Sequence, residues 1–319
     1  MRVTVVICGY TLDRLEALTA AIDSVLAQTH QPLEVVIVID GNPTLYERVN
    51  TVYGDEPAVL TALNDENRGI SYSRTRGAEL ATGDVVAFID DDAVAEPTWI
   101  AEHVRMYEED DVIGVAGTVE PAWVGGRPPF FPAPFYWLVG CTEPGFASPG
   151  AAVRNGYGSN VSYRRDAFLL VGGYDSATGR KGDRHIQAHE APVGIKLARR
   201  FEPPLLFVPT ARVRHTLFAY RGRFRWLLFR SFWQGYSKFI LQRLYPGAQA
   251  EERRFAVRLV TRWAPSKLRE IVRGRRLRGI QQLGAAVAFS AAIAGGYMWA
   301  IIDDLISFTG RRRKASDEV

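Results

Sequence analysis

The sequence predicts an α/β fold in which a mostly parallel sheet carries helices on both faces. Short runs that are almost entirely apolar, as expected of strands buried on both sides, lie at residues 3–8, 33–39, 59–63 and 85–89. Segments with the residue spacing of helices separate these runs. Strands that alternate with helices in this way form a parallel sheet with helices packed on its two faces.

Each expected element follows from its local pattern. Residues 15–26 place apolar side chains three or four positions apart, which gives a helix with one apolar face. A second helix is expected at residues 71–80, between the third and fourth strands. Later in the chain the pattern predicts a short helix at residues 165–171 and strands at 112–119, 156–163 and 205–208.

A long segment rich in proline and aromatic residues occupies residues 121–149. Its aromatic residues are Trp123, Phe130, Phe131, Phe135, Tyr136, Trp137 and Phe146. The segment is too irregular for one helix or strand and too aromatic for a solvated linker. A loop of this length inside a compact domain is typical of a functional or partner-facing segment.

Polar clusters follow three of the expected strands. They are Gly9-Tyr10 after the first strand, Asp40-Gly41-Asn42 after the second and Asp90-Asp91-Asp92 after the fourth. Ligands of open parallel sheets bind beyond the carboxyl ends of the strands, so the clusters should share one cleft. Carboxylate oxygens suit Mg²⁺ or Mn²⁺, and these cations keep coordination positions for phosphate oxygens. The pattern therefore indicates a metal-bound nucleotide diphosphate, whereas the triple aspartate alone would also fit an acidic turn.

The charge distribution points to an anionic partner. The 319-residue chain has a formal net charge of +4, and its basic residues crowd the C-terminal third. This asymmetry suits a membrane surface or a phosphate-bearing ligand. No recognised nucleic-acid-binding module accompanies the charge, so nucleic acid is not an expected partner.

The two cysteines, Cys8 and Cys141, lack metal-ligand spacing and are expected to be free thiols. At the N-terminus, a strand that begins at residue 3 leaves no room for a secretory signal.

The C-terminal part is expected to contact a membrane. Residues 217–245 interleave aromatic and basic side chains, as interfacial helices do, although a helix packed on the preceding domain fits equally well. Residues 283–302 carry no charge and are long enough to cross a bilayer, with a buried Ala- and Gly-rich helix as the alternative. The expected organisation is a nucleotide-binding domain at 1–220, interfacial helices at 221–279, and a membrane-spanning or membrane-associated helix with a basic tail at 280–319.

Separated motifs occur in a fixed order along the first part of the chain. They lie at residues 3–7, 38–41, 67–69 with 73–78, 81–84 and 88–92. In this order they strongly resemble the family 2 glycosyltransferases, and the resemblance covers residues 1–220. It implies the GT-A fold, a Rossmann-like sheet domain, and a donor that is a nucleotide-diphospho-sugar. It also implies a cell-membrane location with the catalytic domain in the cytoplasm.

Matched position by position, the resemblance implies a donor site. Asp40 would contact the base of the nucleotide, and Arg74 would contact the diphosphate or the nearby carboxylates. Asp90 and Asp91 would complete the donor-binding set, with Asp90 near the ribose or a water of the metal. Asp92 would ligate Mg²⁺ or Mn²⁺ together with Asp90. A turn-capping role for Asp40 and a surface salt bridge for Arg74 are the structural alternatives.

The acceptor side is matched less closely. Gly158, Ser159 and Asn160 resemble the segment that faces the acceptor in the family. Family members then carry an acidic pair that supplies the general base, and here the pair is His189-Glu190. Glu190 is therefore the expected catalytic base, which would accept the proton of the attacking hydroxyl, and Asp183 is the second candidate. His215 follows a late strand and is a further expected metal ligand, while a helix first-turn acid is the structural alternative for Glu190.

The resemblance implies an inverting, metal-dependent glycosyltransferase. It would move glucuronate or a hexose from a nucleotide-diphospho-sugar to a glycan linked to polyprenyl or dolichyl phosphate, in protein N-glycosylation or surface polysaccharide assembly. In layout the chain is similar to archaeal glucosyl-dolichyl phosphate glucuronosyltransferases. Two alternatives stay open. A nucleotidyltransferase would want a glycine-rich phosphate loop near the N-terminus, and a catalytically inactive protein would bind glycans at the membrane.

Overall fold

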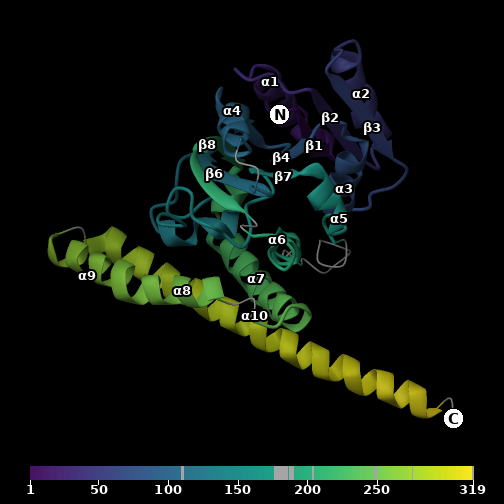
Figure 1. Ribbon diagram of the computed structural model, residues 1–319. Coiled ribbons are helices and arrows are strands. Elements are labelled where there is room, and N and C mark those ends of the chain that lie inside the picture. The colour runs from purple at the N-terminus through teal and green to yellow at the C-terminus, as the bar shows by residue number, and fades with distance from the viewer. Residues whose placement is uncertain are drawn as a thin grey trace.

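The computed structural model confirms the α/β architecture (Figure 1). It describes the whole chain except residues 109–110, 176–185, 187–189, 203–204, 248–249, 275 and 318–319, and except the side chains of 250 and 307–317. The described residues form an 8-stranded sheet in the order β3-β2-β1-β4-β7-β6-β8-β5. In Figure 1 this sheet domain forms the upper body of the molecule, and the C-terminal helices extend below it.

The first half of the sheet is parallel, as predicted. Its strands are β1 (Val3–Gly9), β2 (Glu34–Asp40), β3 (Val59–Asn64) and β4 (Val85–Asp90). The second half is mixed and contains β5 (Ala93–Ala95), β6 (Gly114–Trp123), β7 (Val161–Arg164) and β8 (Leu206–Leu217). β7 runs antiparallel to both β4 and β6, while β8 is parallel to β6 and antiparallel to β5.

Alternate side chains of each central strand enter different cores. Val3, Val5 and Ile7 of β1 face one core, whose helices are α1 (Leu15–Leu26), α2 (Pro43–Tyr53) and α4 (Trp99–Met106). Val6 and Cys8 face the other core, whose helices are α3 (Ile70–Leu80), α5 (Arg165–Leu170) and α6 (Glu190–Ala198). This period of two on a strand buried on both sides explains why the strand sequences are continuously apolar.

The aromatic segment after β6 differs from the loop that its sequence suggests. It contains a 3₁₀ helix, η2 (Ala133–Val139), and Phe131 and Phe135 are completely buried. Phe289, far along the chain, packs edge-on against both rings at centroid distances of 6.0 and 5.6 Å. The segment is therefore core that joins the sheet domain to the C-terminal helices, and its aromatic content reflects burial.

The C-terminal helices pack on one another and on the sheet domain. They are α7 (Phe224–Leu244), α8 (Ala250–Arg258), a π-helical turn η5 (Leu259–Trp263), α9 (Ala264–Val272) and α10 (Arg276–Asp317). A short 3₁₀ turn, η4 (Ala219–Gly222), joins β8 to α7. In Figure 1, α10 runs diagonally below the sheet domain, and it packs along α7 and α9.

Two glycines set the close approach of α7 and α10. A Cβ on Gly235 would lie 1.9 Å from the carbonyl oxygen of Ile293, and a Cβ on Gly296 would lie 1.8 Å from that of Phe232. Only a residue without a side chain fits at either position, as at other helix contacts where the backbones nearly touch. The Gly-rich sequence of α10 therefore serves helix packing in this fold.

Asn160 joins several elements of the core through its amide. Its side-chain oxygen accepts hydrogen bonds from the indole of Trp99 at 2.8 Å and lies 3.0 Å from Nε2 of His103. Its side-chain nitrogen donates to the carbonyls of Thr118 and Ala211, both at 2.9 Å. The residue is completely buried, so this predicted acceptor-side residue uses its side chain within the protein.

We predict that Asn160→Ala lowers the free energy of unfolding by at least about 2 kcal/mol, because it leaves buried donors and acceptors without partners. Urea titration of the full chain, followed by circular dichroism, measures the change. Asn50→Ala, at an exposed position of α2, is the control and should leave the midpoint almost unchanged. An unaltered midpoint in Asn160→Ala would contradict this role of the amide.

Candidate active site

A cleft of about 1850 Å³ opens at the carboxyl ends of the parallel strands. Its walls include Gly9 at the end of β1, Asp40 at the end of β2 and Asp90-Asp91-Asp92, which begin at the last residue of β4. This is the edge at which open α/β sheets bind their ligands. The structure thus brings the three predicted polar clusters into one site. The cleft continues past Gly158, Glu190 and His215 to the C-terminal helices α7 and α8.

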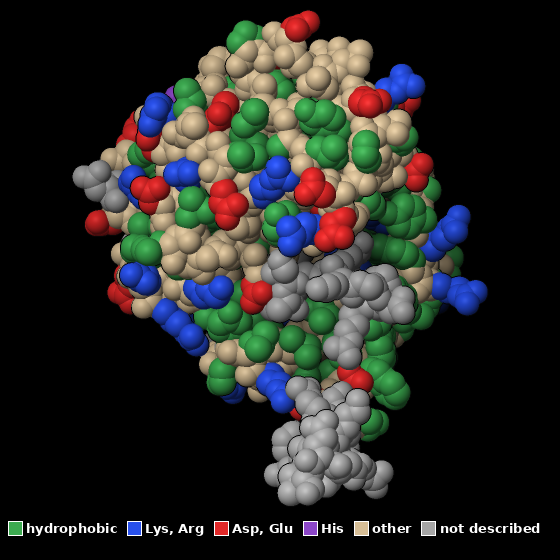
Figure 2. All heavy atoms as spheres, turned by 90° about the vertical axis from the view of Figure 1, so that its right-hand side faces the viewer, with side chains coloured by type: hydrophobic (Ala, Val, Ile, Leu, Met, Phe, Trp, Pro, Cys, Tyr) green, Lys and Arg blue, Asp and Glu red, His purple; other side chains and the backbone are tan. Residues whose placement is uncertain are grey.

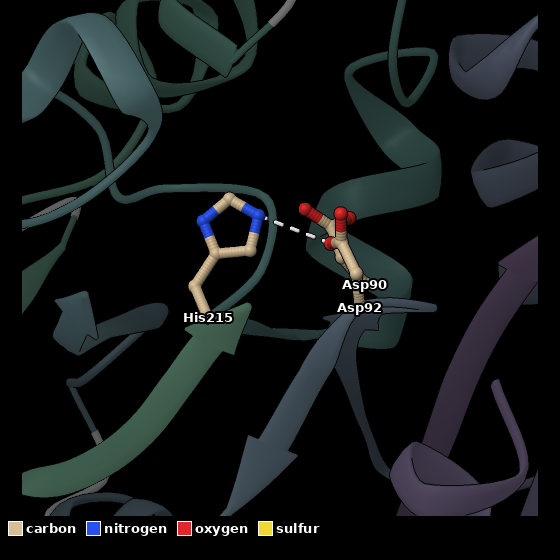
Figure 3. A group of neighbouring side chains, drawn as sticks. All are labelled: Asp90, Asp92 and His215. Carbon is tan, nitrogen blue, oxygen red and sulfur yellow. Dashed lines mark ion pairs between the residues drawn. The ribbon is translucent and has the colours of Figure 1, made fainter. Parts of the chain in front are cut away.

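The pairing of β5 with β8 places His215 beside Asp92. Ala93 is the register partner of His215, and the backbone N–H of Thr216 donates to the carbonyl of Asp92 at 2.7 Å. The imidazole Nε2 then lies 3.0 Å from a carboxylate oxygen of Asp92 (Figure 3). One ligand atom from each of Asp90, Asp92 and His215 lies within 4.8 Å of the others, so the predicted metal ligands meet.

Positive groups surround the buried Asp92 carboxylate. Arg221 lies 2.9 Å and Arg14 3.3 Å from one of its oxygens, and His215 contacts the other. Burial alone would raise the pKa of Asp92, but these cations outweigh it and lower the pKa below its usual range. Burial would likewise lower the pKa of His215, and the Asp92 carboxylate raises it to about 10.

Asp91 differs from its two neighbours. Its carboxylate accepts a hydrogen bond from Arg14 at 3.0 Å and lies outside the Asp90, Asp92 and His215 group. Burial, together with the nearby charge of Asp92, raises the pKa of Asp91 to about 7. The pKa values of two adjacent buried carboxylates therefore shift in opposite directions, because Asp92 has three cationic neighbours and Asp91 contacts Arg14.

Arg74 supports the floor of the cleft from α3. The side chain is almost completely buried and forms an ion pair with Asp90. Its guanidinium lies 5.4 Å from the centre of the Tyr174 ring. A Cβ on Gly158 would lie 2.2 Å from its Nη1, so Gly158 leaves the space that the guanidinium occupies. Arg74 therefore forms a buried ion pair inside the site, and the surface salt bridge expected as its structural alternative is not what the structure shows.

Asp40 organises the turn that precedes α3. Its carboxylate accepts hydrogen bonds from the backbone N–H groups of Arg68 at 3.0 Å and Gly69 at 2.8 Å. The side chain of Asn64 donates a third at 2.6 Å. Asp40 also lines the cleft, so its carboxylate shapes the wall at which the nucleotide base is expected. These hydrogen bonds are those of the structural alternative, in which the Asp40 carboxylate caps a turn.

Glu190 begins α6 and lines the same cleft. It is close enough to Arg74 and Tyr174 that its negative charge contributes to raising the pKa of both groups. The second base candidate, Asp183, and the neighbouring His189 lie outside the described residues. On the acceptor side, Gly158 and Ser159 line the cleft, whereas the amide of Asn160 is used in the core.

Arg14 and Arg221 are site residues that the sequence interpretation missed. Arg14 precedes α1 and contacts both Asp91 and Asp92. Arg221 belongs to the basic and aromatic stretch after β8, whose sequence fits an interfacial helix and a helix packed on the preceding domain equally well. Its guanidinium reaches Asp92, and its Nη1 lies 3.0 Å from Nε2 of His215. The sequence does hold one signal for Arg221: it follows the expected metal ligand His215 by six positions.

Comparison with known proteins decides the family. The sequence profile described as "Glycosyl transferase family 2" matches residues 4–170. The glucosyl-dolichyl phosphate glucuronosyltransferase of Haloferax volcanii is 51% identical over 303 residues, which are 95% of this chain and 97% of that protein. The chain belongs to glycosyltransferase family 2. It is therefore a glycosyltransferase, and the predicted family and enzyme class are confirmed.

Solved structures confirm the GT-A fold of this glycosyltransferase. The mannosyltransferase PcManGT of Pyrobaculum calidifontis, solved with GDP-Man and Mn²⁺, has a TM-score of 0.59 at 17% identity and covers 95% of this chain and 87% of its own. GalNAc-T7, solved with UDP, GalNAc and Mn²⁺, has a TM-score of 0.51 at 19% identity, with coverages of 80% and 53%. At these identities the likeness concerns the fold alone.

We predict that Gly158→Ala in this glycosyltransferase lowers the transfer rate by about 10²-fold, because the added Cβ displaces Arg74 from Asp90. Gly284→Ala is the matched control, since a Cβ there meets no atom within 4 Å. Transfer is measured with purified full-length protein, and thermal unfolding is recorded in parallel. A Gly158→Ala enzyme with normal turnover would contradict the steric requirement.

Proposed function

We propose that the chain is an inverting, metal-dependent glycosyltransferase that uses a nucleotide-diphospho-sugar and acts on a lipid-linked glycan. The observation that carries this proposal is the meeting of Asp90, Asp92 and His215 at the carboxyl edge of the sheet. The Haloferax volcanii relative is named for a dolichyl phosphate acceptor and for glucuronosyl transfer. Glucuronate or a hexose is the proposed sugar, and protein N-glycosylation or surface polysaccharide assembly is the proposed pathway.

The residues present fit a Mg²⁺ or Mn²⁺ ion. Two carboxylates and one imidazole offer hard oxygen and nitrogen ligands, and the cleft beside them is open for phosphate oxygens and water. Asp90, Asp92 and His215 would hold the ion, with the Nε2 nitrogen of His215 as its ligand atom. When bound, the ion would neutralise the charge that develops on the departing diphosphate. Both solved neighbours named above contain Mn²⁺.

Arginines of this chain would hold the donor diphosphate. Arg14 and Arg221 lie at the edge of the carboxylate group and line the cleft. Once Asp92 binds the metal, their guanidinium groups would be available to phosphate oxygens, which they bind with a matching planar geometry. Arg74 would keep its pair with Asp90 and so fix the orientation of that ligand.

Glu190 would act as the general base on the acceptor side. The oxygen of the acceptor hydroxyl forms a bond to the anomeric carbon while the bond from that carbon to the diphosphate oxygen breaks. The hydroxyl proton passes to the carboxylate of Glu190, and the nucleoside diphosphate leaves with the bonding electrons. One displacement inverts the anomeric configuration. Gly158 and Ser159 would border the acceptor sugar, since they line the cleft with Glu190.

Attachment to the cytoplasmic side of a membrane is part of the proposal. The helix at Arg276–Ile306 is long and apolar enough to cross a bilayer, and 28% of its most apolar window is buried in the protein. Asp303 of α10 accepts a hydrogen bond from Tyr236, and Asp304 pairs with Arg243. The uncharged stretch of α10 packs along α7, so a spanning helix would draw the Arg230 and Lys238 side chains of α7 toward hydrocarbon, which is costly. We therefore favour a helix that lies along the membrane surface over one that crosses it.

The exposed side chains support such a surface contact. Exposed apolar residues of α7 and α10 near the C-terminal end are Leu244, Met298, Trp299, Ile302, Leu305 and Ile306. Figure 2 shows hydrophobic side chains gathered on the lower part of this face, while acidic and basic side chains are interspersed above. An apolar surface beside basic residues is typical of proteins that bind membranes at the headgroup level.

The family assignment disfavours the two alternative functions. A nucleotidyltransferase has no support from the profile or the relatives, which are glycosyltransferases. A catalytically inactive glycan-binding protein would have no need of a buried carboxylate and histidine group at the sheet edge. A nucleotide-release assay with a panel of UDP- and GDP-sugars, in the presence of a polyprenyl-phosphate-linked sugar, tests the proposed activity and identifies the donor.

We predict that Asp92→Asn weakens Mn²⁺ binding by at least about tenfold and removes most of the turnover, because one charged ligand is lost. Mn²⁺ affinity is measured by electron paramagnetic resonance in the presence of UDP or GDP. Asp55→Asn, at an exposed turn position, should leave both quantities unchanged. Normal Mn²⁺ affinity in Asp92→Asn would refute the metal site.

We predict that Glu190→Gln lowers the transfer rate by about 10²–10⁴-fold, because the amide cannot accept a proton. The affinity for the nucleotide should hardly change, since the base serves the acceptor hydroxyl. Asp183→Asn, measured in the same way, tests the second candidate. Loss of transfer in Asp183→Asn alone would move the base to that residue, and near-normal transfer in both variants would refute the single displacement as assigned.

A further inference from the structure

A row of arginines lines the outer end of the cleft. Arg254, Arg258 and Arg262 lie four positions apart on α8 and η5, and all three face the same cleft as the carboxylates. Arg262 lies in the π-helical turn η5, four positions after Arg258. Such single π turns occur frequently at functional sites.

Ion pairs join α8 to the opposite side of the cleft through its glutamates, and they leave two arginines of the row without an ion pair among the described residues. Glu252 lies 3.2 Å from Arg154 and 3.0 Å from Lys238, and Glu251 lies 3.6 Å from Arg154. Arg258 contacts Glu143 at 3.5 Å. The acidic residues of α8 are therefore occupied. Across the described residues, Arg254 and Arg262 form no ion pair, so their charges remain available to a ligand.

The donor does not account for these arginines. A nucleotide diphosphate at the carboxylate cluster already has Arg14, Arg221 and the metal ligands beside it. The arginine row belongs to another part of the cleft wall, which the C-terminal helices form together with Trp226 and Phe229. A second anionic group is therefore expected at this end.

The surroundings of the row indicate what carries that anion. Exposed apolar side chains flank it on the same helices and on the neighbouring ones: Val257, Val260, Leu268, Val272, Leu277 and Ile280. Phosphate next to apolar surface matches the chemistry of a polyprenyl phosphate, in which a charged group joins a sugar to a hydrocarbon chain. A free phosphate ion would gain nothing from the apolar flank.

We propose that Arg254 and Arg262, with Arg258 between them, bind the phosphate of the lipid-linked acceptor, so that its sugar reaches Glu190 and its hydrocarbon chain leaves along the apolar flank. This inference rests on the proposed function and assigns its acceptor a binding site. The row is a binding element for the acceptor and takes no part in donor binding.

The test uses full-length protein in detergent and farnesyl phosphate as the probe, with binding followed by tryptophan fluorescence. Farnesol, which lacks the phosphate, and inorganic phosphate, which lacks the chain, are the comparison ligands. The double variant Arg254→Gln/Arg262→Gln should bind farnesyl phosphate about tenfold more weakly, a value that allows for solvent screening of exposed arginines. The matched control Arg269→Gln/Arg273→Gln removes the same charge from α9 and from the residue that follows it, outside the cleft lining.

The outcomes separate this site from its rivals. Tighter binding of farnesyl phosphate than of either comparison ligand, lost in the cleft variant and kept in the control, supports the proposal. Equal loss in both double variants would mean general surface attraction and would overturn it. So would equal affinity for farnesol, or an inorganic phosphate affinity that matches the probe.

Donor binding is measured in the same samples to keep the two claims apart. Mn²⁺-dependent binding of UDP or GDP should be identical in the unaltered protein and in both double variants. Failure of the unaltered protein to bind either nucleotide with Mn²⁺ would overturn the proposed function. Normal nucleotide binding with unaltered farnesyl phosphate affinity in the cleft variant would overturn the arginine site alone.

Discussion

The neutralisation of adjacent carboxylates at the end of β4 is the constraint on which the site depends. Asp91 and Asp92 are buried, and buried negative charge is tolerated only where cations or protons balance it. Arg14 comes from the start of α1, His215 from β8 and Arg221 from the turn after β8. The site therefore needs both halves of the sheet in register. A divalent cation at the carboxylates would balance the same buried negative charge with a single ion.

The sequence predicts the parallel half of the fold because the physical signals there are local. Continuous apolar runs reveal strands buried on both faces, and polar residues at their ends mark the ligand edge. The positions of Asp40 and Asp90 in the cleft follow from these strands, whereas Arg74 lies on α3 and is identified through the family resemblance. The resemblance also favours the metal site over an acidic turn and adds the sugar of the donor.

Features that depend on long-range pairing could not be predicted in the same way. The contact of His215 with Asp92 follows from the register of β5 and β8, and β5 is too short to leave a pattern. The aromatic and basic residues around Arg221 fit an interfacial helix and a helix packed on the domain equally well, and long-range packing of neighbours such as Trp226 on the sheet domain decides between the two. The burial of Asn160 depends on Trp99, His103 and two distant carbonyls, and none of these contacts is local in sequence.

In the proposed site, a metal that carries the donor diphosphate takes the place of Arg14 and Arg221 beside Asp92 and also binds His215. Pulsed electron paramagnetic resonance of Mn²⁺ added to the full-length protein with UDP or GDP tests it directly. We expect a ¹⁴N coupling from one directly bound imidazole together with ³¹P couplings from the diphosphate, and loss of the ¹⁴N coupling in His215→Ala. A bound Mn²⁺–nucleotide complex without any ¹⁴N coupling would contradict it.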